Sequence, residues 1–329
     1  MLRAGTRPIS ALAAAALGLA SFGLAACTSG DEAVAPTSVR VAATLFPLEE
    51  IVRNVAGTAL GETVELVQVV PPGQAVHDVE PTPQQLEALG SADVVLYVGG
   101  GFQPSIEEAV ATLPDDVTIV DLLDAVEVLP VTDPVAGDGS GDADADHGTG
   151  GGDPHAWLSP DRMTSMAAAA ASVIEQRLEQ AGLDGAAAVA AGVDRFATAM
   201  HDLDVEYSNG LALCESSTLV TGHHAFAYLA ASFGLTYASI AGISPSEEPS
   251  AATLESIADY ATANGVTTIF FEENLPDDLA RTLADEIGAQ VGVLDPIESP
   301  SRDQLDAGAT YVSLMQDNLR ALRTGLRCT

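Results

Sequence analysis

The chain contains no lysine, and its only basic side chains are twelve arginines, set against 47 aspartates and glutamates. The formal net charge of the 329 residues is therefore −35. A field of this sign repels nucleic acid and anionic lipid headgroups and attracts cations. The balance of charge excludes nucleic acid as a partner. It does not by itself name a ligand, because most of these carboxylates need only keep the protein soluble.

Cysteine is scarce, with three residues in the chain. The first, Cys27, ends the apolar stretch 9–27, which follows Arg3 and Arg7. This stretch is too short and too rich in alanine and glycine for a permanent membrane span, and its basic start is typical of an export signal. Its last residues, Leu24 to Cys27, resemble the lipobox of bacterial lipoproteins. We therefore expect a signal peptide over residues 1–27 and a lipid on Cys27.

The other two cysteines are Cys214 and Cys328, and neither belongs to a CxxC pair. Two cysteines in an exported domain most simply form a disulfide. The bond would pin the C-terminal helix and stabilise the fold by about 2–4 kcal/mol. A pair of metal-binding thiolates is the alternative, although the spacing does not favour it.

The remaining chain is expected to form an α/β fold of two lobes. Strand-like and helix-like segments alternate from Val39 to about residue 123 and again from about 217 to 295, which predicts two parallel sheets with crossover helices. The predicted parts are a flexible tether at 28–38, an N-terminal lobe at 39–183, a long linking helix at 184–210 and a C-terminal lobe at 211–329. Further helices are expected at about 161–181 and about 305–327.

Residues 132–152 interrupt the N-terminal lobe. The segment is rich in Asp and Gly, lacks apolar periodicity and contains one histidine, His147. These features predict a flexible acidic loop.

Histidines and carboxylates follow several of the predicted strands. In open parallel sheets, ligands bind beyond the carboxyl ends of the strands. His77 and His223 come after strands of the two blocks, and His155 lies in a loop before the helical section. Glu272 and Asp295 follow strands of the second block. Three imidazoles and one carboxylate suit Zn²⁺, whereas a Mn²⁺ site is expected to carry more oxygen ligands.

Four segments carry a resemblance to a known family. They read PPGQAVHDVEPTP, DPHAWLSP, LVTGHHAFAYLA and VGVLDP, in that order. Together they resemble the metal-binding solute-binding lipoproteins of ABC importers, the cluster A-I type that carries zinc or manganese. The resemblance implies that His77, His155, His223 and Asp295 are the metal ligands, in a cleft between two lobes joined by one long rigid helix.

Other residues near the predicted site receive secondary roles. Glu272 is either an alternative ligand or an acceptor for a histidine N–H. His224 is a neighbour of the ligand His223, and Trp157 is expected to form a wall that excludes water. Zinc members of the family often have a His-rich loop before the second ligand, and the Asp-rich loop here puts a zinc-collecting role in doubt.

The expected function is capture of Zn²⁺ outside the cytoplasmic membrane and delivery to the membrane subunits of an ABC permease. The protein would be a monomer, held to the outer face of that membrane by its lipid, and would not be an enzyme. Mn²⁺ is the alternative cargo. A zinc hydrolase and a surface adhesin are the other candidates, but the chain has no HExxH motif and no separate adhesin motif.

Overall fold

The structure is a computed structural model that describes residues 36–132, 152–246, 249–272 and 278–329. Residues Pro36–Thr329 form one compact unit. The predicted signal peptide, Cys27, most of the tether and nearly all of the acidic loop lie outside the described residues. Within the described part, none of the helices combines the length and the apolar character needed to cross a membrane.

The first sheet has four parallel strands in the order β2-β1-β3-β4. Its strands are β1 (Val39–Ala43), β2 (Val64–Gln68), β3 (Val94–Tyr97) and β4 (Thr118–Asp121). The helices of this block are α1 (Phe46–Ala56), α2 (Pro83–Gly90) and α3 (Pro104–Val110), with 3₁₀ turns η1 (Gly57–Ala59) and η2 (Leu122–Ala125). β1 and β3 are almost entirely buried, as expected for the inner strands of a parallel sheet.

The second sheet repeats this topology with the order β6-β5-β7-β8, again all parallel. Its strands are β5 (Thr218–Thr221), β6 (Thr236–Ser239), β7 (Thr268–Phe271) and β8 (Gln290–Val293), and its helices are α6 (Ala227–Phe233), α7 (Ala251–Ala263) and α8 (Asp278–Ile287). Two parallel sheets flanked by helices confirm the predicted fold class. The strand order reverses between β5 and β7, so the loops after these two strands flank the crevice where such sheets bind ligands.

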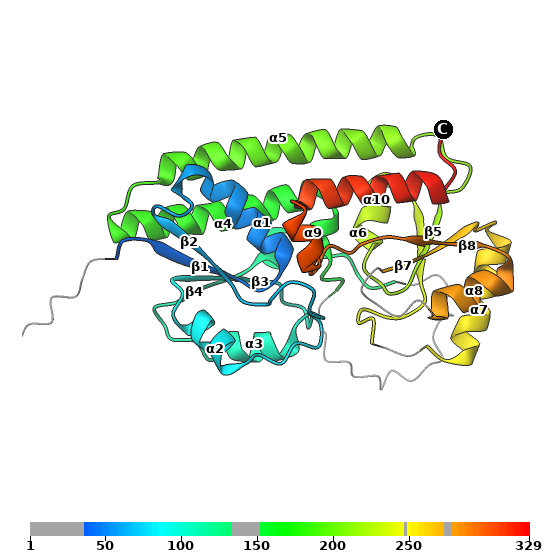
Figure 1. Cartoon of the computed structure of the whole chain (residues 1–329), viewed down its shortest axis with the longest axis horizontal. Helices are drawn as coiled ribbons and strands as arrows, with labels where there is room; N and C mark the ends of the chain where they lie inside the picture. The colour runs from blue at the N-terminus through cyan, green and yellow to red at the C-terminus, as the bar shows by residue number, and fades with distance from the viewer. Residues whose placement is uncertain (1–35, 133–151, 247–248, 273–277) are drawn as a thin grey trace, which may run out of the picture. The chain divides into compact units, whose positions relative to one another are not determined.

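A pair of long helices, α4 (Pro160–Ala181) and α5 (Ala186–Leu211), separates the two sheets in sequence. α5 lies where the linking helix was predicted, and it packs on α1 and α4 of the first block and on α10 (Tyr311–Gly325) near the C-terminus (Figure 1). Gly192 permits the closest approach, because a Cβ atom there would lie 2.2 Å from the carbonyl oxygen of Val55 in α1. α5 is thus held against helices of the first block and against the last helix of the described chain.

The single helix predicted at about 305–327 is instead two helices, α9 (Arg302–Asp306) and α10. Gly308 has a φ of +88°, a conformation that ends α9 at little cost only because the residue is glycine. Thr310 then starts α10 with a capping box, in which its Oγ1 accepts a hydrogen bond from the Ser313 N–H at 3.2 Å.

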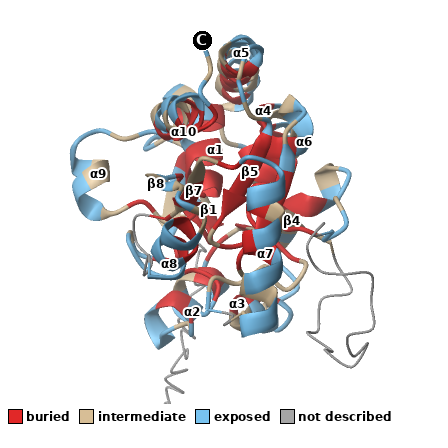
Figure 2. Cartoon of the chain, turned by 90° about the vertical axis from the view of Figure 1, so that its right-hand side faces the viewer, coloured by how far each residue is buried: buried red, intermediate tan, exposed pale blue. Residues whose placement is uncertain are grey.

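The apolar core is shared between the two blocks. One cluster of buried residues includes Val41 and Leu96 of the first sheet together with Leu219 and Phe226 of the second block. Figure 2 shows that the buried residues lie on the sheets and on the inward faces of the helices, while the outward helix faces are exposed. A second, smaller cluster lies under α7 and α8. The first cluster fixes the segments that carry the histidines described below.

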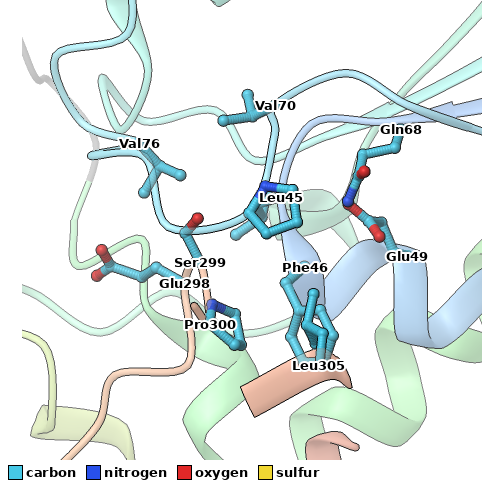
Figure 3. Close-up of a pocket in the computed structure, with 11 residues that line it drawn as sticks. Leu45, Phe46, Glu49, Gln68, Val70, Val76, Glu298, Ser299, Pro300 and Leu305 are labelled. Carbon is cyan, nitrogen blue, oxygen red and sulfur yellow. The ribbon is translucent and has the colours of Figure 1, made fainter. Parts of the chain in front are cut away.

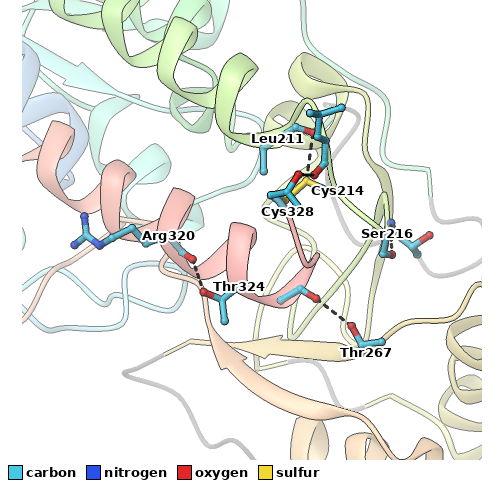
Figure 4. The surroundings of a disulfide bond; sticks show 11 residues. Leu211, Cys214, Ser216, Thr267, Arg320, Thr324 and Cys328 are labelled. Carbon is cyan, nitrogen blue, oxygen red and sulfur yellow. Dashed lines mark hydrogen bonds between the residues drawn. A yellow bond between two sulfur atoms is a disulfide. The ribbon is translucent and has the colours of Figure 1, made fainter.

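Cys214 and Cys328 are joined by a disulfide, as predicted (Figure 4). The bond spans 114 positions of sequence and ties the end of the chain, just after α10, to the segment that follows α5. The alternative assignment of these cysteines as metal ligands is therefore wrong.

Removing this disulfide is expected to destabilise the protein without removing its metal site. The double variant Cys214→Ser/Cys328→Ser should lose about 2–5 kcal/mol of unfolding free energy, because the unfolded chain regains the freedom of a very long loop. Urea denaturation of the oxidised protein and of the double variant measures the difference. Equal urea midpoints would show that the bond does not constrain the fold. Loss of bound zinc in the double variant would indicate that the cysteines take part in the metal site.

Candidate metal centre

Four buried side chains converge on one point in the structure. Each of His77, His155, His223 and Glu298 offers one ligand atom, and these atoms all lie within 4.8 Å of one another. The Nε2 atoms of the three imidazoles lie 3.3, 3.3 and 3.5 Å from Oε1 of Glu298, in that order. The three histidines are those that the sequence predicted, and two separate blocks of the chain supply the group.

His77 lies in the loop that follows β2 and is 6% exposed. Its ring meets the ring of Phe102 edge-on, with 4.5 Å between the centroids. The Nε2 amide group of Gln103, which is almost fully buried, donates a hydrogen bond to the carbonyl oxygen of Val76 at 3.2 Å. The peptide before His77 is therefore held from the start of α3.

His155 is fully buried and is oriented by a residue two positions earlier in the chain. Asp153 Oδ1 accepts hydrogen bonds from the backbone N–H of His155 at 2.9 Å and from its Nδ1 at 2.8 Å. The Tyr228 hydroxyl in turn donates to the carbonyl oxygen of Asp153 at 2.7 Å. No role for Asp153 was predicted from the sequence, although the Asp-Pro-His triplet is a short-range signal for such a contact.

Trp157 forms the wall of the site that the sequence predicted. It lies in the 3₁₀ turn η3 (Ala156–Leu158), is fully buried, and has its ring centroid 5.2 Å from that of His155. Its Nε1 donates a hydrogen bond to the carbonyl oxygen of Pro296 at 2.8 Å. The indole therefore excludes water from one side of the site and joins the first block to the segment after β8.

His223 follows β5 at the carboxyl edge of the second sheet and is fully buried. Its carbonyl oxygen accepts hydrogen bonds from Thr221 Oγ1 at 2.8 Å and from the Tyr237 hydroxyl at 2.9 Å. Its Nδ1 contacts Oε1 of Glu272, at the end of the neighbouring strand β7. Of the two roles predicted for Glu272, the structure favours that of acceptor for a histidine N–H. His224 lies outside the group, with its Nδ1 3.2 Å from Ser239 Oγ.

The fourth position differs from the prediction. The structure brings Glu298, not Asp295, next to the three imidazoles. The Oδ1 atom of Asp295 instead accepts a hydrogen bond from the backbone N–H of Ile297 at 2.7 Å, and this contact forms a turn just before Glu298. The sequence signal was present in the run Asp-Pro-Ile-Glu, which carries two carboxylates after the last strand of the sheet. The motif alone does not say which of them faces the histidines.

The geometry of the group calls for a cation. When Nδ1 of His155 and of His223 donates to a carboxylate, the neutral ring presents a lone pair on Nε2. Those two Nε2 atoms are buried and have no hydrogen-bond partner in suitable geometry among the described residues. They face the carboxylate of Glu298, so several acceptors meet without a donor. Three nitrogens and one oxygen are also a donor set that Zn²⁺ accepts in tetrahedral sites.

The pKa values of these groups reflect the same crowding of acceptors. Burial lowers the pKa of His223, but the carboxylates of Glu272 and Glu298 outweigh it and raise this pKa to about 10. For His155, too, burial lowers the pKa, and Asp153 and Glu298 raise it to a net increase. Burial raises the pKa of Glu298, whereas the three imidazoles bring it well below its usual range. The site therefore favours positive charge at its centre, supplied by protons or by a metal ion.

A cavity of about 80 Å³ reaches the site from the side of His77, Glu272 and Glu298. Its wall also includes the carboxylates of Asp78 and Asp295. A second cavity of about 10 Å³, enough for roughly one water molecule, lies behind Glu298 among apolar side chains such as Leu45 and Phe46. Figure 3 shows the Glu298 carboxylate directed away from Phe46 and Leu305. Of these two cavities, the first borders His77 as well as Glu298, so it lies against the group that could hold a cation.

Known proteins resemble this chain in both sequence and fold. The family described as zinc-uptake complex component A, periplasmic, matches residues 41–325. The zinc-binding lipoprotein AdcA of Streptococcus pneumoniae R6 is 30% identical over 310 residues, which are 93% of this chain and 59% of that lipoprotein. The high-affinity zinc uptake system protein ZnuA of Bacillus subtilis is 29% identical over 322 residues, 96% of this chain and 94% of that protein.

Solved structures agree with the sequence relatives. The Zn(II)-bound ZnuA-like domain of S. pneumoniae AdcA has a TM-score of 0.68 and 28% identity, and the match covers 88% of this chain and 99% of that one. The metal-dependent lipoprotein YcdH of B. subtilis has a TM-score of 0.70 and 28% identity, with the same coverage. The family match extends over most of the chain and includes all four residues that converge in the structure. The chain therefore belongs to the family of the periplasmic component A of zinc-uptake complexes.

Proposed function

We propose that this protein captures Zn²⁺ outside the cytoplasmic membrane and delivers it to an ABC permease for uptake. The observation that carries the proposal is the convergence of three buried Nε2 atoms on the carboxylate of Glu298. The relatives support it, because AdcA and ZnuA are named for zinc binding and zinc uptake. The chain spans 59% of the length of AdcA, so the proposal concerns only the part that the two proteins share.

We propose His77, His155, His223 and Glu298 as the zinc ligands, with Glu272 and Asp153 accepting the outer N–H groups of two imidazoles. Outer acceptors of this kind fix the tautomer and the direction of the ring and make the ligand nitrogen more basic. Imidazole-rich sites suit zinc, whereas manganese prefers carboxylate and water oxygens. Manganese is the second cargo to be tested.

The same donor set supports a binding role over a hydrolytic one. Catalytic zinc sites usually keep one position open for water, with three protein ligands. Here a fourth protein ligand is at hand in Glu298, which is itself 9% exposed. The described residues that contact the imidazoles include the rings of Phe102 and Trp157 and the acceptors Asp153 and Glu272. This arrangement suits an ion that is held and later released.

The way in which the ion is bound and released follows from the position of the proposed ligands in the two blocks. The first block supplies His77 and His155, and the second supplies His223 and Glu298, so a bound ion connects the two. The shared core and α5 limit their relative motion, so we expect slight tilting and loop ordering on binding. The permease would then promote release by disfavouring this geometry.

We also propose that the protein is exported and lipid-anchored at Cys27 and that it acts as a monomer. The lipobox-like segment Leu24 to Cys27 supports the anchor. The family description places its members in the periplasm. The anchor would keep the metal site next to the permease at the outer face of the cytoplasmic membrane.

Metal analysis of the mature protein, purified in detergent, tests the proposal. After dialysis against excess Zn²⁺ and Mn²⁺ together, mass spectrometry should find one zinc and no manganese per chain. One manganese in its place would change the cargo and keep the transport role. Absence of both metals would refute the site. Steady hydrolysis of a model ester or peptide by the zinc-loaded protein would instead support an enzyme.

A further inference from the structure

The backbone just before Glu298 has an uncommon conformation. Ile297 has a φ of 60°, in the left-handed region that β-branched residues rarely adopt, and its side chain is fully buried. A residue of this type keeps such a conformation only when its surroundings impose it. Because Glu298 is the next residue, the direction of its carboxylate depends on this conformation.

Hydrogen bonds from several parts of the chain hold the turn formed by residues 295–297. Asp295 Oδ1 accepts from the Ile297 N–H at 2.7 Å. Asn318, which lies in α10 and is 2% exposed, binds both sides of Asp295: its Oδ1 accepts from the Asp295 N–H at 2.8 Å, and its Nδ2 donates to the Asp295 carbonyl oxygen at 2.6 Å. Trp157 holds the carbonyl oxygen of Pro296.

Asn318 is an unusual residue for the buried face of α10. Asparagine is a poor helix former, and the adjacent buried positions of this helix, such as Leu314, Leu319 and Leu322, are apolar. A leucine would serve better if packing alone were required. The amide provides one acceptor and one donor that match the two backbone groups of Asp295, and this match is the evident use of a polar side chain there.

We propose that Asn318 is a positioning residue for the metal. It fixes the backbone of Asp295, whose carboxylate then holds Ile297 in the left-handed conformation and directs Glu298 at the three imidazoles. This inference rests on the proposed zinc-binding function and assigns Asp295 to the turn instead of to the metal. Metal–ligand distances in protein sites lie within about 0.2 Å of their standard values, so a loosened turn weakens binding even when every ligand is present.

The test is the zinc affinity of Asn318→Ala, measured by competition with a chelator on the mature protein. The affinity should fall about 10–100-fold, as for other residues that orient metal ligands. Leu322→Ala is the matched control, because it removes a buried side chain from the same helix without touching Asp295. It should lower the melting temperature and leave the zinc affinity within about threefold of wild type.

A double-mutant cycle separates positioning from general damage. Once Glu298→Ala has removed the fourth donor atom, adding Asn318→Ala should have little further effect on zinc affinity, because there is no carboxylate left to direct at the metal. An equal loss in both backgrounds, or no loss in the wild-type background, overturns the proposal. If the wild-type protein itself binds no zinc, the proposed function fails before this inference is reached.

A second pair of variants keeps the inference testable even if Asn318→Ala does not fold. Asp295→Asn retains an oxygen that can accept the Ile297 N–H, whereas Asp295→Ala removes it. We expect Asp295→Asn to bind zinc within about threefold of wild type and Asp295→Ala to bind about 10–100-fold more weakly. Equal losses in both variants would mean that the charge of Asp295 acts on the metal directly, and this result overturns the assignment.

Discussion

Replacing His155 with alanine is expected to lower the affinity for zinc by more than about 100-fold, beyond the range seen when outer partners of metal ligands are removed. The substitution deletes one of the Nε2 atoms that converge on Glu298. It also leaves the Asp153 carboxylate, which is fully buried, without the imidazole N–H that it accepts. Competition with a chelator measures the affinity of the variant.

The same substitution should remove most of the stabilisation that zinc gives to the folded protein. At free zinc about 1,000-fold above the dissociation constant, a bound ligand adds about 4 kcal/mol to the free energy of unfolding. Thermal unfolding of the wild type with and without zinc should show this increase, and in His155→Ala the increase at the same zinc concentration should fall to about 1.4 kcal/mol or less. His201→Ala, which changes an exposed histidine of α5, is the control and should behave as wild type. A zinc-dependent shift in His155→Ala as large as that of the wild type would exclude His155 as a ligand.

The two-block α/β fold was predictable because its signals are local. Most strands of the two sheets are rich in apolar and β-branched residues, and glycine or proline marks many of the turns, so the alternation is visible in the sequence. Three of the proposed ligands were predictable for a related reason. His77, His155 and His223 lie in segments whose neighbours also serve the site, such as Asp153 and Trp157, so each motif is longer than its single ligand.

The fourth proposed ligand was not predictable, because its direction is decided by residues distant in sequence. Asp295 and Glu298 are three positions apart and chemically similar. The choice between them depends on the left-handed conformation of Ile297 and on Asn318, which reaches Asp295 from α10. Neither the conformation of Ile297 nor the contact from Asn318 can be recognised from the motif itself. The break between α9 and α10 is different, because Gly308 and the Ser/Thr spacing of the capping box are visible in the sequence.

Zinc affinity is expected to rise steeply with pH between 7 and 9. In the metal-free protein the pKa of His223 is raised to about 10: burial lowers it, but the neighbouring Glu272 and Glu298 carboxylates more than compensate. At neutral pH this imidazole is therefore protonated, and zinc must displace the proton to reach Nε2. With one proton released, the affinity should increase about tenfold per pH unit, or about 100-fold over this range. Titration calorimetry in buffers of different ionisation enthalpy would measure the number of protons released when zinc binds.

The stability of the metal-free protein should change in the opposite direction. A histidine whose pKa is about 10 when folded and about 6.5 when unfolded stabilises the fold fully below pH 6.5, and this contribution is lost as the pH rises toward 10. Metal-free protein should thus become easier to unfold over the interval in which it binds zinc more tightly. Glu272→Gln removes the largest of the influences that raise the pKa of His223, so it should flatten both dependences. A zinc affinity that did not vary from pH 7 to 9 would mean that protons and zinc do not compete at His223.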